Sequence, residues 1–296
     1  MHVLVTGATG QVGYELLRLV PKGFTVAGFG SAELDITDAA VVAETVKRES
    51  PDLIINAAAY TAVDKAEAEP ELAYAVNQDG VANLATVAAQ RKIPLLHIST
   101  DYVFAGDAET AYCEEDTPAP SGVYGASKLA GEKVLAETCA KHLIMRTSWV
   151  FGVHGNNFVK TMLRLSQERK ELSIVADQHG CPTSAASIAR ALWALAEQYR
   201  DKGALQWGLY HYAGLPSCTW HEFAKNIFDT AYELDLLRRS PILKAIGTAD
   251  FPTPAKRPAW SVLDSHLLER MHGIKPSDWQ LELRDVLKEL RSLSNS

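Results

Sequence analysis

The sequence lacks long hydrophobic runs, because no stretch approaches the ~18 apolar residues that a membrane-spanning helix requires. The first residues, Met1-His2-Val3-Leu4-Val5, also lack the charged start and long apolar segment of a secretory signal peptide. Both absences predict a cytoplasmic protein that has no membrane as a partner.

Cysteine and clustered positive charge are scarce as well. The 4 cysteines are widely spaced without a CxxC pair, so reduced thiols are expected and neither a disulfide framework nor a metal site is indicated. The formal net charge is -7, and no dense run of Lys and Arg occurs. A nucleic acid is therefore not expected as a partner. A nucleotide ligand, which needs only a few local donors, is still possible.

What the sequence does have is a repeated alternation of apolar runs with helical patterns, in a chain of 296 residues of which 47% are hydrophobic. This alternation predicts an α/β fold of Rossmann type, with a right-handed, doubly wound, parallel sheet. We expect a dinucleotide-binding domain over residues 1–150. Residues 151–296 are expected to form a smaller, mixed substrate-binding lobe, with the elements at about 185–213 returning to the Rossmann sheet.

The first apolar run, Val3 to Val5, leads directly into a glycine-rich segment with Gly7, Gly10 and Gly13 in a G-x-x-G-x-x-G pattern. A helical pattern follows from residue 14. Glycine permits positive φ and close approach of the backbone, and a helix N-terminus attracts a pyrophosphate. Three glycines alone are a weak signal, but their place directly after a strand favours dinucleotide binding.

The second strand ends in Gly28-Phe29-Gly30-Ser31, with neither an acid nor an arginine. An acid at this place commonly binds the ribose 2′-hydroxyl and disfavours a 2′-phosphate. Its absence favours NADPH slightly and leaves NADH possible. Further on, Asp35 to Asp38 opens a helix that runs to about Glu49, with Thr37 or Asp38 as N-cap; Asp35 is either a turn residue or a polar contact to the adenine.

Tyr124 and Lys128 are four residues apart in a segment that reads as a helix, so both side chains lie on one helical face. A neighbouring ammonium favours the phenolate and moves the tyrosine pKa towards the working range, which suits a general acid or base. Thr100, at the end of an apolar run that reads as a buried strand, is the candidate third member. The alternative is an ordinary surface pair on a helix.

Eight ordered motifs run nearly from end to end of the chain: T-G-A-T-G-Q-V-G (6–13), L-D-I-T-D (34–38), N-A-A-A-Y-T-A-V-D-K-A-E (56–67), S-T-D-Y-V-F (99–104), Y-G-A-S-K-L-A-G-E (124–132), R-T-S-W-V-F-G (146–152), D-Q-H-G-C-P-T (177–183) and T-P-A-K-R-P (253–258). On these motifs the chain resembles the extended short-chain dehydrogenase/reductases. The resemblance implies hydride transfer from a reduced nicotinamide to C4 of a 4-keto-6-deoxyhexose carried on dTDP. The substrate is thus a small nucleotide sugar.

The resemblance also implies functional residues. The catalytic triad falls on Thr100, Tyr124 and Lys128. Cofactor contacts fall on Gly7, Gly10, Gln11, Val12, Asp35, Ile36, Ala58, Ala59 and Tyr60, together with Tyr124 and Lys128, and substrate contacts fall on Thr100, Asp101 and Trp149. On chemical grounds we add Arg257 for the substrate diphosphate, since a guanidinium fork suits that group. Core packing is the alternative for Trp149, and a structural role is the alternative for Arg257.

One departure from the family pattern, the question of a metal and several functional alternatives accompany the resemblance. Ala105 stands where these proteins usually have an acid. Some members dimerise through a magnesium ion held by carboxylates, but Glu15 has no identifiable partners in the sequence, so no metal is predicted, and the protein is expected as a monomer or homodimer. The functional alternatives are a nucleotide-sugar dehydratase, whose second acid is replaced here by Tyr102, an epimerase, and a non-catalytic regulatory subunit that binds NAD(P).

Overall fold

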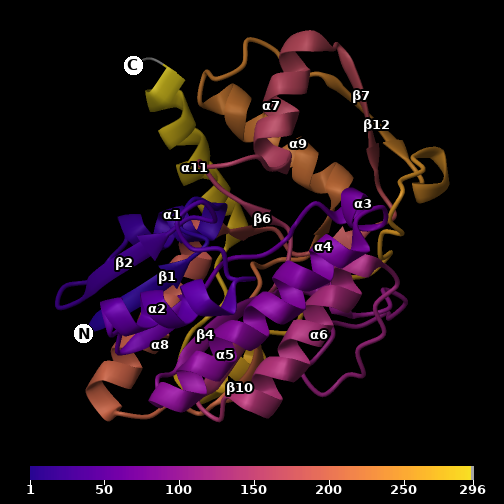
Figure 1. The fold of residues 1–296 in the computed structure, drawn as a ribbon. Helices are drawn as coiled ribbons and strands as arrows, with labels where there is room; N and C mark the ends of the chain where they lie inside the picture. Colours follow the sequence, from indigo (N-terminus) through magenta and orange to yellow (C-terminus); the bar gives the residue numbers. More distant parts are fainter. Residues whose placement is uncertain (295–296) are drawn as a thin grey trace.

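A computed structural model describes residues 1–294 and has a six-stranded sheet at its centre, in the order β10-β5-β4-β3-β1-β2. All neighbouring strands pair in parallel. The prediction of a doubly wound Rossmann-type sheet is therefore confirmed (Figure 1). The strands are β1 (His2–Thr6), β2 (Thr25–Phe29), β3 (Leu53–Asn56), β4 (Leu95–Thr100), β5 (His142–Thr147) and β10 (Gly208–His211).

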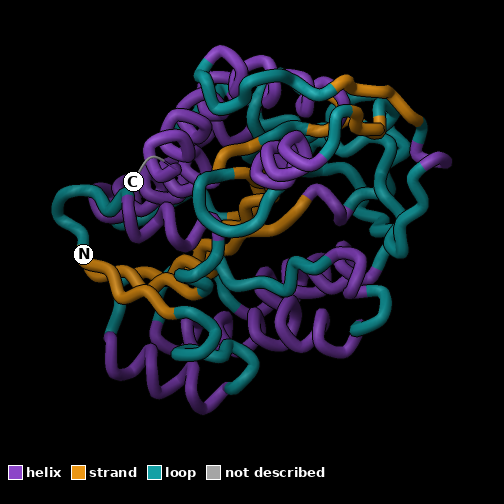
Figure 2. The backbone as a smooth tube through the Cα atoms, turned by 90° about the horizontal axis from the view of Figure 1, so that it is seen from above, coloured by secondary structure: helices purple, strands orange, loops and turns teal. Residues whose placement is uncertain are grey.

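Helices cover both faces of this sheet because the strands are apolar on both sides (Figure 2). In β1, for example, Val3 and Val5 face one layer and Leu4 faces the other. The first layer contains α1 (Gln11–Arg18), α8 (Ala185–Lys202) and α10 (His266–His272). The second contains α2 (Ala39–Glu49), α5 (Gly80–Arg91) and α6 (Val123–Thr138).

The strand order reverses between β1 and β3, because the chain runs from β1 to the edge strand β2 and then crosses back. In open α/β sheets, ligands bind outside the carboxyl ends of the strands at such a switch point. The loops that follow β1, β3, β4 and β5 all lie at this edge. The fold thereby brings the glycine-rich turn and the segments that follow β3 and β4 to one place.

A second group of elements lies beyond this edge. It contains α7 (Phe158–Glu168), α9 (Trp220–Glu233) and α11 (Trp279–Ser294), which share one apolar core with β7 (Glu171–Val175). The small strand pairs of this part are β12 (Ile242–Ile246) with β7, β11 (Cys218–Thr219) with β8 (His179–Gly180), and β6 (Val150–Phe151) with β9 (Thr183–Ser184). The division into two domains at residue 150 stays a prediction. Two elements from the second half of the chain lie with the Rossmann sheet, because α8 packs on α1 and β10 pairs with β5.

Short helices connect the sheet to the site. They are α3 (Val63–Ala66), α4 (Pro70–Tyr74), the π-helical turn η1 (Ala75–Asp79), and the 3₁₀ turns η2 (Asp101–Val103) and η3 (Thr248–Asp250). The expected helix after Asp38 is α2, with the Asp38 carboxylate accepting from the backbone N–H groups of Ala40 and Val41. No helix in the described part of the chain is both long enough and apolar enough to cross a membrane.

Two expected strands end earlier than their apolar patterns suggest. The third strand stops at Asn56, and the fifth stops at Thr147 before Trp149, whose φ is 45°. A bulky residue at positive φ is uncommon. The chain turns there towards β6, and this turn presents the Trp149 side chain to the space above the sheet.

Candidate active site

A cleft of about 970 Å³ opens between the carboxyl edge of the sheet and the second group of elements. Its wall includes the glycine-rich turn, the ends of β3, β4 and β5, the start of α6, and α7. Ten of the residues singled out in the sequence line it: Gly10, Gln11, Val12, Ala59, Thr100, Asp101, Tyr124, Lys128, Trp149 and Arg257. Gly7, Asp35, Ile36, Ala58 and Tyr60 are outside this lining.

The glycine-rich turn fits a dinucleotide. Gly7 has φ 68°, and a Cβ on it would lie 2.5 Å from the backbone nitrogen of Ala58. The turn after β1 therefore packs directly on the loop after β3. Gly10 is the N-cap of α1 and, lacking a side chain, leaves the first N–H groups of the helix without a side-chain cap. Such groups, at the positive end of the helix dipole, suit a pyrophosphate.

An acidic side chain, Glu33, lies near the end of the second strand, where the sequence pattern indicated none. Glu33, three residues beyond Gly30, folds back so that its carboxylate accepts the Gly30 N–H at 3.0 Å. A carboxylate at the end of the second strand commonly binds the ribose hydroxyls and disfavours a 2′-phosphate. Glu33 is thus an acid near this strand end that the sequence-based argument did not consider, and the choice between NADPH and NADH stays a prediction.

The remaining predicted cofactor residues have local roles. Asp35 accepts from the backbone N–H and the hydroxyl of Thr37, as a turn residue does. Ile36 is buried against Gly80 in the core. The Tyr60 backbone N–H donates to Asn77, and its hydroxyl donates to Glu69 at 2.6 Å. A cofactor contact by these residues stays a prediction.

Thr100, Tyr124 and Lys128 meet at the floor of the cleft. Thr100 ends β4, and Tyr124 and Lys128 come from successive turns of α6. The Thr100 hydroxyl donates to Asp101 Oδ1 at 3.0 Å and accepts the Tyr102 N–H at 3.2 Å. Tyr102 packs edge-on against Tyr124, with 5.5 Å between ring centroids. A hydroxyl, a phenol and an amine thus line one cleft. Lys128 is buried and Tyr124 is half-buried, so the two are not an ordinary surface pair on a helix.

The electrostatics of the pair differ from our expectation. Burial raises the pKa of Tyr124; the hydrogen bond with Thr100 opposes this effect and the charge of Asp101 adds to it. The amino group of Lys128 points away from Tyr124, because its Nζ lies 2.7 Å from the Ile98 carbonyl oxygen and 3.3 Å from His97 Nε2. Burial also lowers the pKa of Lys128 to about 8. The predicted downward shift of the Tyr124 pKa by Lys128 is therefore absent in this structure.

Asp101 is a buried acid on the cleft wall. Burial raises its pKa to about 6, against hydrogen bonds that lower it. Its Oδ2 has no hydrogen-bond partner among residues 1–294. A buried polar atom without a partner at a cleft is a marker of a ligand contact.

Aromatic rings form the opposite wall. Trp149 stacks on Trp220 with 3.5 Å between ring centroids, and Phe158 leans on Trp220 at 4.6 Å. Gly180 lies behind Trp149, where a Cβ would come within 2.3 Å of the indole. Trp149 therefore packs closely and also faces the cleft, so the two interpretations of this residue are compatible.

Arg257 bridges the cleft entrance. Its Nη2 lies 2.7 Å from the Asp64 carboxylate, and its guanidinium lies over the Tyr102 ring at 6.0 Å. Its buried Nη1 has no hydrogen-bond partner within the described part of the chain. The side chain therefore has both a structural tie and a free donor, which keeps both sequence-based interpretations open.

Several lining residues have no sequence motif that singles them out. Trp220 and Phe158 begin helices far along the chain. Asn157, the N-cap of α7, donates to the Gln11 side chain at 3.0 Å across 146 residues. The sequence contains only the Ser, Thr or Asn capping residue before each of these helices. Such a residue predicts where a helix begins, and it does not predict that the helix lines the cleft.

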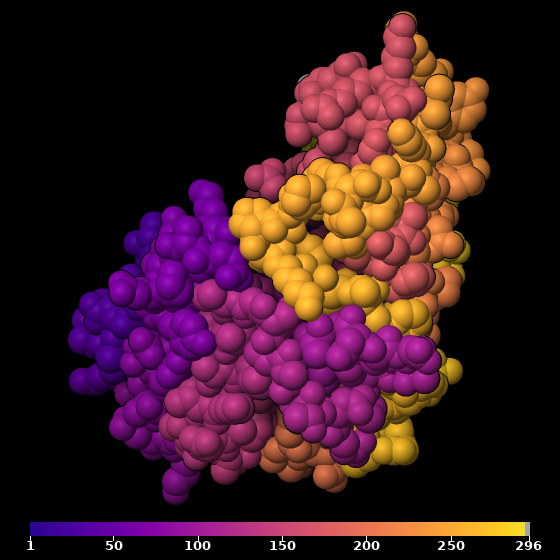
Figure 3. All heavy atoms as spheres, turned by 90° about the vertical axis from the view of Figure 1, so that its right-hand side faces the viewer, coloured from indigo at the N-terminus to yellow at the C-terminus, as the bar shows by residue number. Residues whose placement is uncertain are grey.

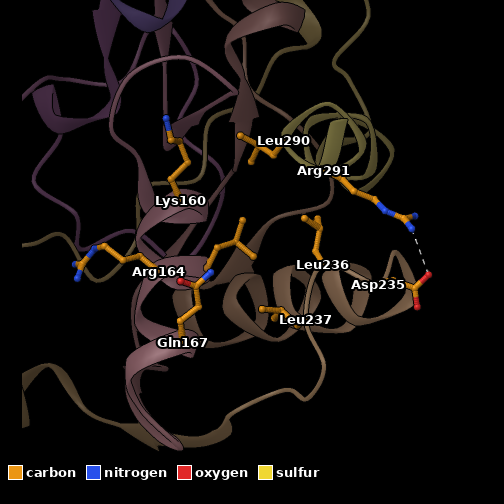
Figure 4. Close-up of a pocket in the computed structure, with 9 residues that line it drawn as sticks. Lys160, Arg164, Gln167, Asp235, Leu236, Leu237, Leu290 and Arg291 are labelled. Atoms are coloured by element: carbon orange, nitrogen blue, oxygen red, sulfur yellow. Dashed lines mark ion pairs between the residues drawn. The ribbon is translucent and has the colours of Figure 1, made fainter. Parts of the chain in front are cut away.

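A second cavity of about 470 Å³ lies between α7, α11 and the segment after α9 (Figure 4). Leucine side chains form its floor, and Lys160, Arg164 and Arg291 lie around it. Arg291 is paired with Asp235 at 3.5 Å. None of the predicted site residues reaches this cavity. Helix α7 separates it from the cleft, because Phe158 and Thr161 line the cleft while Leu163 and Arg164 line the cavity.

Glu15, the sequence's only candidate for a metal contact, is paired with Arg18 at 2.6 Å. Within residues 1–294, no group of three His, Cys, Asp or Glu side chains is arranged to hold a metal ion.

Comparisons with known proteins agree with this geometry. The family model described as the RmlD substrate binding domain matches residues 1–292. A dTDP-4-dehydrorhamnose reductase from Aggregatibacter actinomycetemcomitans is 46% identical over 287 residues, which cover 96% of this chain and 98% of the relative.

Solved structures give the same result. A dTDP-4-dehydrorhamnose reductase from Clostridium acetobutylicum is 37% identical with a TM-score of 0.91, covering 98% of this chain and 100% of the other. The enzyme from Bacillus anthracis, solved in complex with NADP, is 39% identical with a TM-score of 0.90, covering 97% and 99%. The chain therefore belongs to the family of dTDP-4-dehydrorhamnose reductases within the extended short-chain dehydrogenase/reductases.

Proposed function

We propose that this protein reduces the C4 keto group of dTDP-4-dehydro-β-L-rhamnose to give dTDP-L-rhamnose, with NADPH as the reductant. The observation that carries the proposal is the convergence of Thr100, Tyr124 and Lys128 at the floor of a cleft whose far end is the glycine-rich turn. The printed names of relatives that align over nearly the whole chain supply the substrate.

The residues of the turn and its neighbours hold the cofactor. The N–H groups at the start of α1, beyond Gly10, bind the pyrophosphate, and the packing of Gly7 on Ala58 shapes the turn that presents them. When bound, the nicotinamide supplies the hydride. The relative solved with NADP supports NADPH, whereas the Glu33 carboxylate beside Gly30 makes NADH acceptable as a second cofactor.

Two side chains of the triad act on the sugar, and the third lies behind them. Tyr124 protonates the oxygen that becomes the new hydroxyl, which its un-ionised state permits, because burial keeps its pKa above the ordinary value. Thr100 hydrogen-bonds the same oxygen. Lys128, whose pKa is lowered to about 8, lies one helical turn further along α6 and serves the cofactor rather than the sugar, because its Nζ points to the Ile98 carbonyl and not to Tyr124.

The substrate is held from both sides of the cleft. Trp149 and Trp220 offer a flat aromatic wall, which suits stacking on a sugar face or a base. Arg257 directs its unpaired Nη1 to the substrate diphosphate. Asp101, with a free carboxylate oxygen beside Thr100, accepts a sugar hydroxyl.

Absorbance at 340 nm tests the proposal, with purified protein, NADPH or NADH, and the keto sugar generated in situ. We expect oxidation that depends on the sugar. Tyr124→Phe should lower turnover by about 10²-fold or more while leaving cofactor affinity largely intact, since it removes only the acid.

Tyr102→Phe is the matched control, because Tyr102 has the same ring in the same cleft but is not the predicted proton donor. It should retain most of the turnover. Equal loss in both variants, or unchanged turnover in Tyr124→Phe, would remove Tyr124 from the acid role. Absence of oxidation with either cofactor would overturn the proposed substrate.

A further inference from the structure

A buried histidine that the proposed reaction does not use lies directly beneath Lys128. His97, on β4, is fully buried. Its Nε2 is 3.3 Å from Lys128 Nζ, and its Nδ1 is 3.0 Å from Asn56 Nδ2. Two ring nitrogens that both face protein groups leave few protonation states that satisfy every contact.

The orientation of the Asn56 amide is fixed from the other side. Its Oδ1 accepts the Ala58 backbone N–H at 3.0 Å and the Thr6 hydroxyl at 2.6 Å. A backbone N–H can only donate, so the oxygen must face Ala58, and the NH₂ group must face His97. The assignment therefore rests on the backbone and not on a choice between similar atoms.

The tautomer of His97 follows from this orientation. Because Asn56 donates to Nδ1, that nitrogen must carry a lone pair, and the neutral ring has its proton on Nε2. The Nε2–H then points at Lys128 Nζ. If Lys128 were an ammonium, two hydrogen-bond donors, its N–H and the Nε2–H of His97, would face each other. A neutral amine accepts the Nε2–H with its lone pair and still donates to the Ile98 carbonyl at 2.7 Å.

We propose that His97 is a positioning residue for Lys128: held by Asn56, it presents Nε2–H to the lysine nitrogen and thereby favours the neutral amine. Lys128 can then change its protonation state in the neutral range, and its charge contributes to the pH dependence of the proposed reaction. This last consequence rests on the proposed function, whereas the tautomer of His97 does not. Burial, which lowers the pKa of Lys128, acts in the same direction.

Other charges around Lys128 act less directly. Glu132, one turn further along α6, raises the pKa of Lys128, but its carboxylate is already paired with Arg146 of β5 at 2.6 Å. The other titratable groups on α6 and on the elements packed around it are Tyr124, Lys133 and Glu137 on α6 itself, His142 on β5, Asp101 and Tyr102 on η2, Asp64 and Lys65 on α3, and Glu71, Tyr74, Asp79 and Arg91 on α4, η1 and α5. None of these is hydrogen-bonded to Lys128 Nζ in the described residues, unlike His97.

The first test reads the tautomer directly. Long-range ¹H–¹⁵N spectra of the histidine side chains distinguish a protonated from an unprotonated ring nitrogen, and His97→Gln assigns the signal. We expect the Nε2–H tautomer in the protein without substrate, unchanged across about pH 6 to 9, where an ordinary histidine titrates near 6.5. A proton on Nδ1, or conversion to imidazolium in this range, would overturn the proposal.

The second test reverses the tautomer. In Asn56→Asp one carboxylate oxygen still accepts from Ala58 and the other accepts from His97, so the ring proton moves to Nδ1, and Nε2 accepts from a Lys128 ammonium. The limb of the pH profile of kcat/KM assigned to Lys128 should move to higher pH by about one unit or more, since both the tautomer and the added charge favour the ammonium.

Thr6→Val is the matched control. It removes a hydrogen bond to the same Asn56 oxygen but leaves the Ala58 contact that orients the amide. Neither the tautomer nor the limb should move. A limb that shifts equally in both variants would reduce His97 to a structural role. If the tautomer is as stated but no sugar-dependent oxidation occurs, the proposed function fails and the inference about His97 stands.

Discussion

Asp101 illustrates the cost of placing an acid on the wall of this cleft. Its ordinary pKa of 3.8 is raised to about 6 by burial, so the folded state holds a proton that the unfolded state has already lost over this interval. The native state is therefore destabilised above about pH 6, and this penalty disappears as the pH falls through about 4. Hydrogen bonds from Ser261 and Thr100 compensate the charge only in part, because the pKa is raised despite them.

Asp101→Asn should accordingly stabilise the protein at pH 7.5 while impairing the reaction. The difference of about two pKa units corresponds to an increase of roughly 3 kcal/mol in the free energy of unfolding. The amide oxygen keeps the Thr100 hydrogen bond. Urea denaturation of both proteins at pH 7.5 and pH 4 measures the effect. A stability difference that is the same at both pH values would contradict the assigned burial cost.

At the scale of elements, α6 is held on the sheet by a buried ion pair. Arg146 of β5 reaches Glu132 of α6 at 2.6 Å, and both side chains are at most 5% exposed. The guanidinium also lies over the Phe104 ring at 5.0 Å. Glu132 is one turn beyond Lys128, so this pair fixes the helix that positions two members of the triad.

Glu132→Gln leaves the Arg146 charge buried without compensation. It should lower the free energy of unfolding by about 3–5 kcal/mol and reduce turnover by displacing α6. Glu168→Gln on α7 is the control, because it breaks an exposed pair with Arg164 and should cost at most about 1 kcal/mol. Chemical denaturation compares the two. Similar costs in both variants would show that the buried pair does not hold α6.

The turn between β1 and α1 depends on one glycine. Gly7 and Gly203 both have φ near 70°, but a Cβ at Gly7 would collide with Ala58, whereas a Cβ at Gly203 meets nothing within 4 Å. The two positions therefore share backbone strain and differ only in space. This pair separates the conformational role of glycine from its role in close packing.

Gly7→Ala should lower the melting temperature more than Gly203→Ala does. For Gly203→Ala we expect the free energy of unfolding to fall by about 1–2 kcal/mol, from the left-handed conformation alone. Gly7→Ala should also weaken NADPH binding by about tenfold or more, because the turn must move away from the loop after β3. Thermal unfolding and fluorescence titration with NADPH measure the two effects. Unchanged NADPH affinity in Gly7→Ala would separate this turn from the cofactor.

At the scale of the whole molecule, the segment around Arg257 contacts a residue from the first half of the chain, Asp64. In the space-filling view this late segment lies between the two parts of the molecule (Figure 3). Asp64 accepts from Arg257 and from the Ala255 N–H, across 193 and 191 residues of chain. These contacts place a guanidinium at the cleft entrance that neither part could provide alone.

Arg257→Met keeps the length of the side chain and removes its charge. If Arg257 binds the diphosphate, KM for the sugar nucleotide should rise about tenfold or more, with KM for NADPH unchanged. Asp64→Asn is the companion variant: it breaks the same ion pair but leaves the guanidinium, so it should affect KM far less. Steady-state kinetics distinguish them. An equal rise in both would assign Arg257 to the structural tie alone.

The amino-acid sequence alone determined what short spacings can determine. The alternation of apolar runs predicted the parallel sheet, the glycines directly after β1 predicted the turn, and the four-residue spacing placed Tyr124 and Lys128 on one face of α6, because helix and strand geometry fix the directions of nearby side chains. The spatial meeting of Thr100 with this pair followed from strand order.

Only the tertiary structure decided how the charged ends of these side chains are used. Lys128 turns to His97 and Ile98 on β4 and not towards Tyr124, Glu33 folds back on Gly30, and Trp149 finds Trp220 seventy-one positions later. The contacts of Lys128 and Trp149 depend on burial and on partners distant in the chain, and the contact of Glu33 depends on how the loop after β2 folds. Desolvation and hydrogen bonding at such contacts outweigh local preference, and no local pattern in the sequence encodes them.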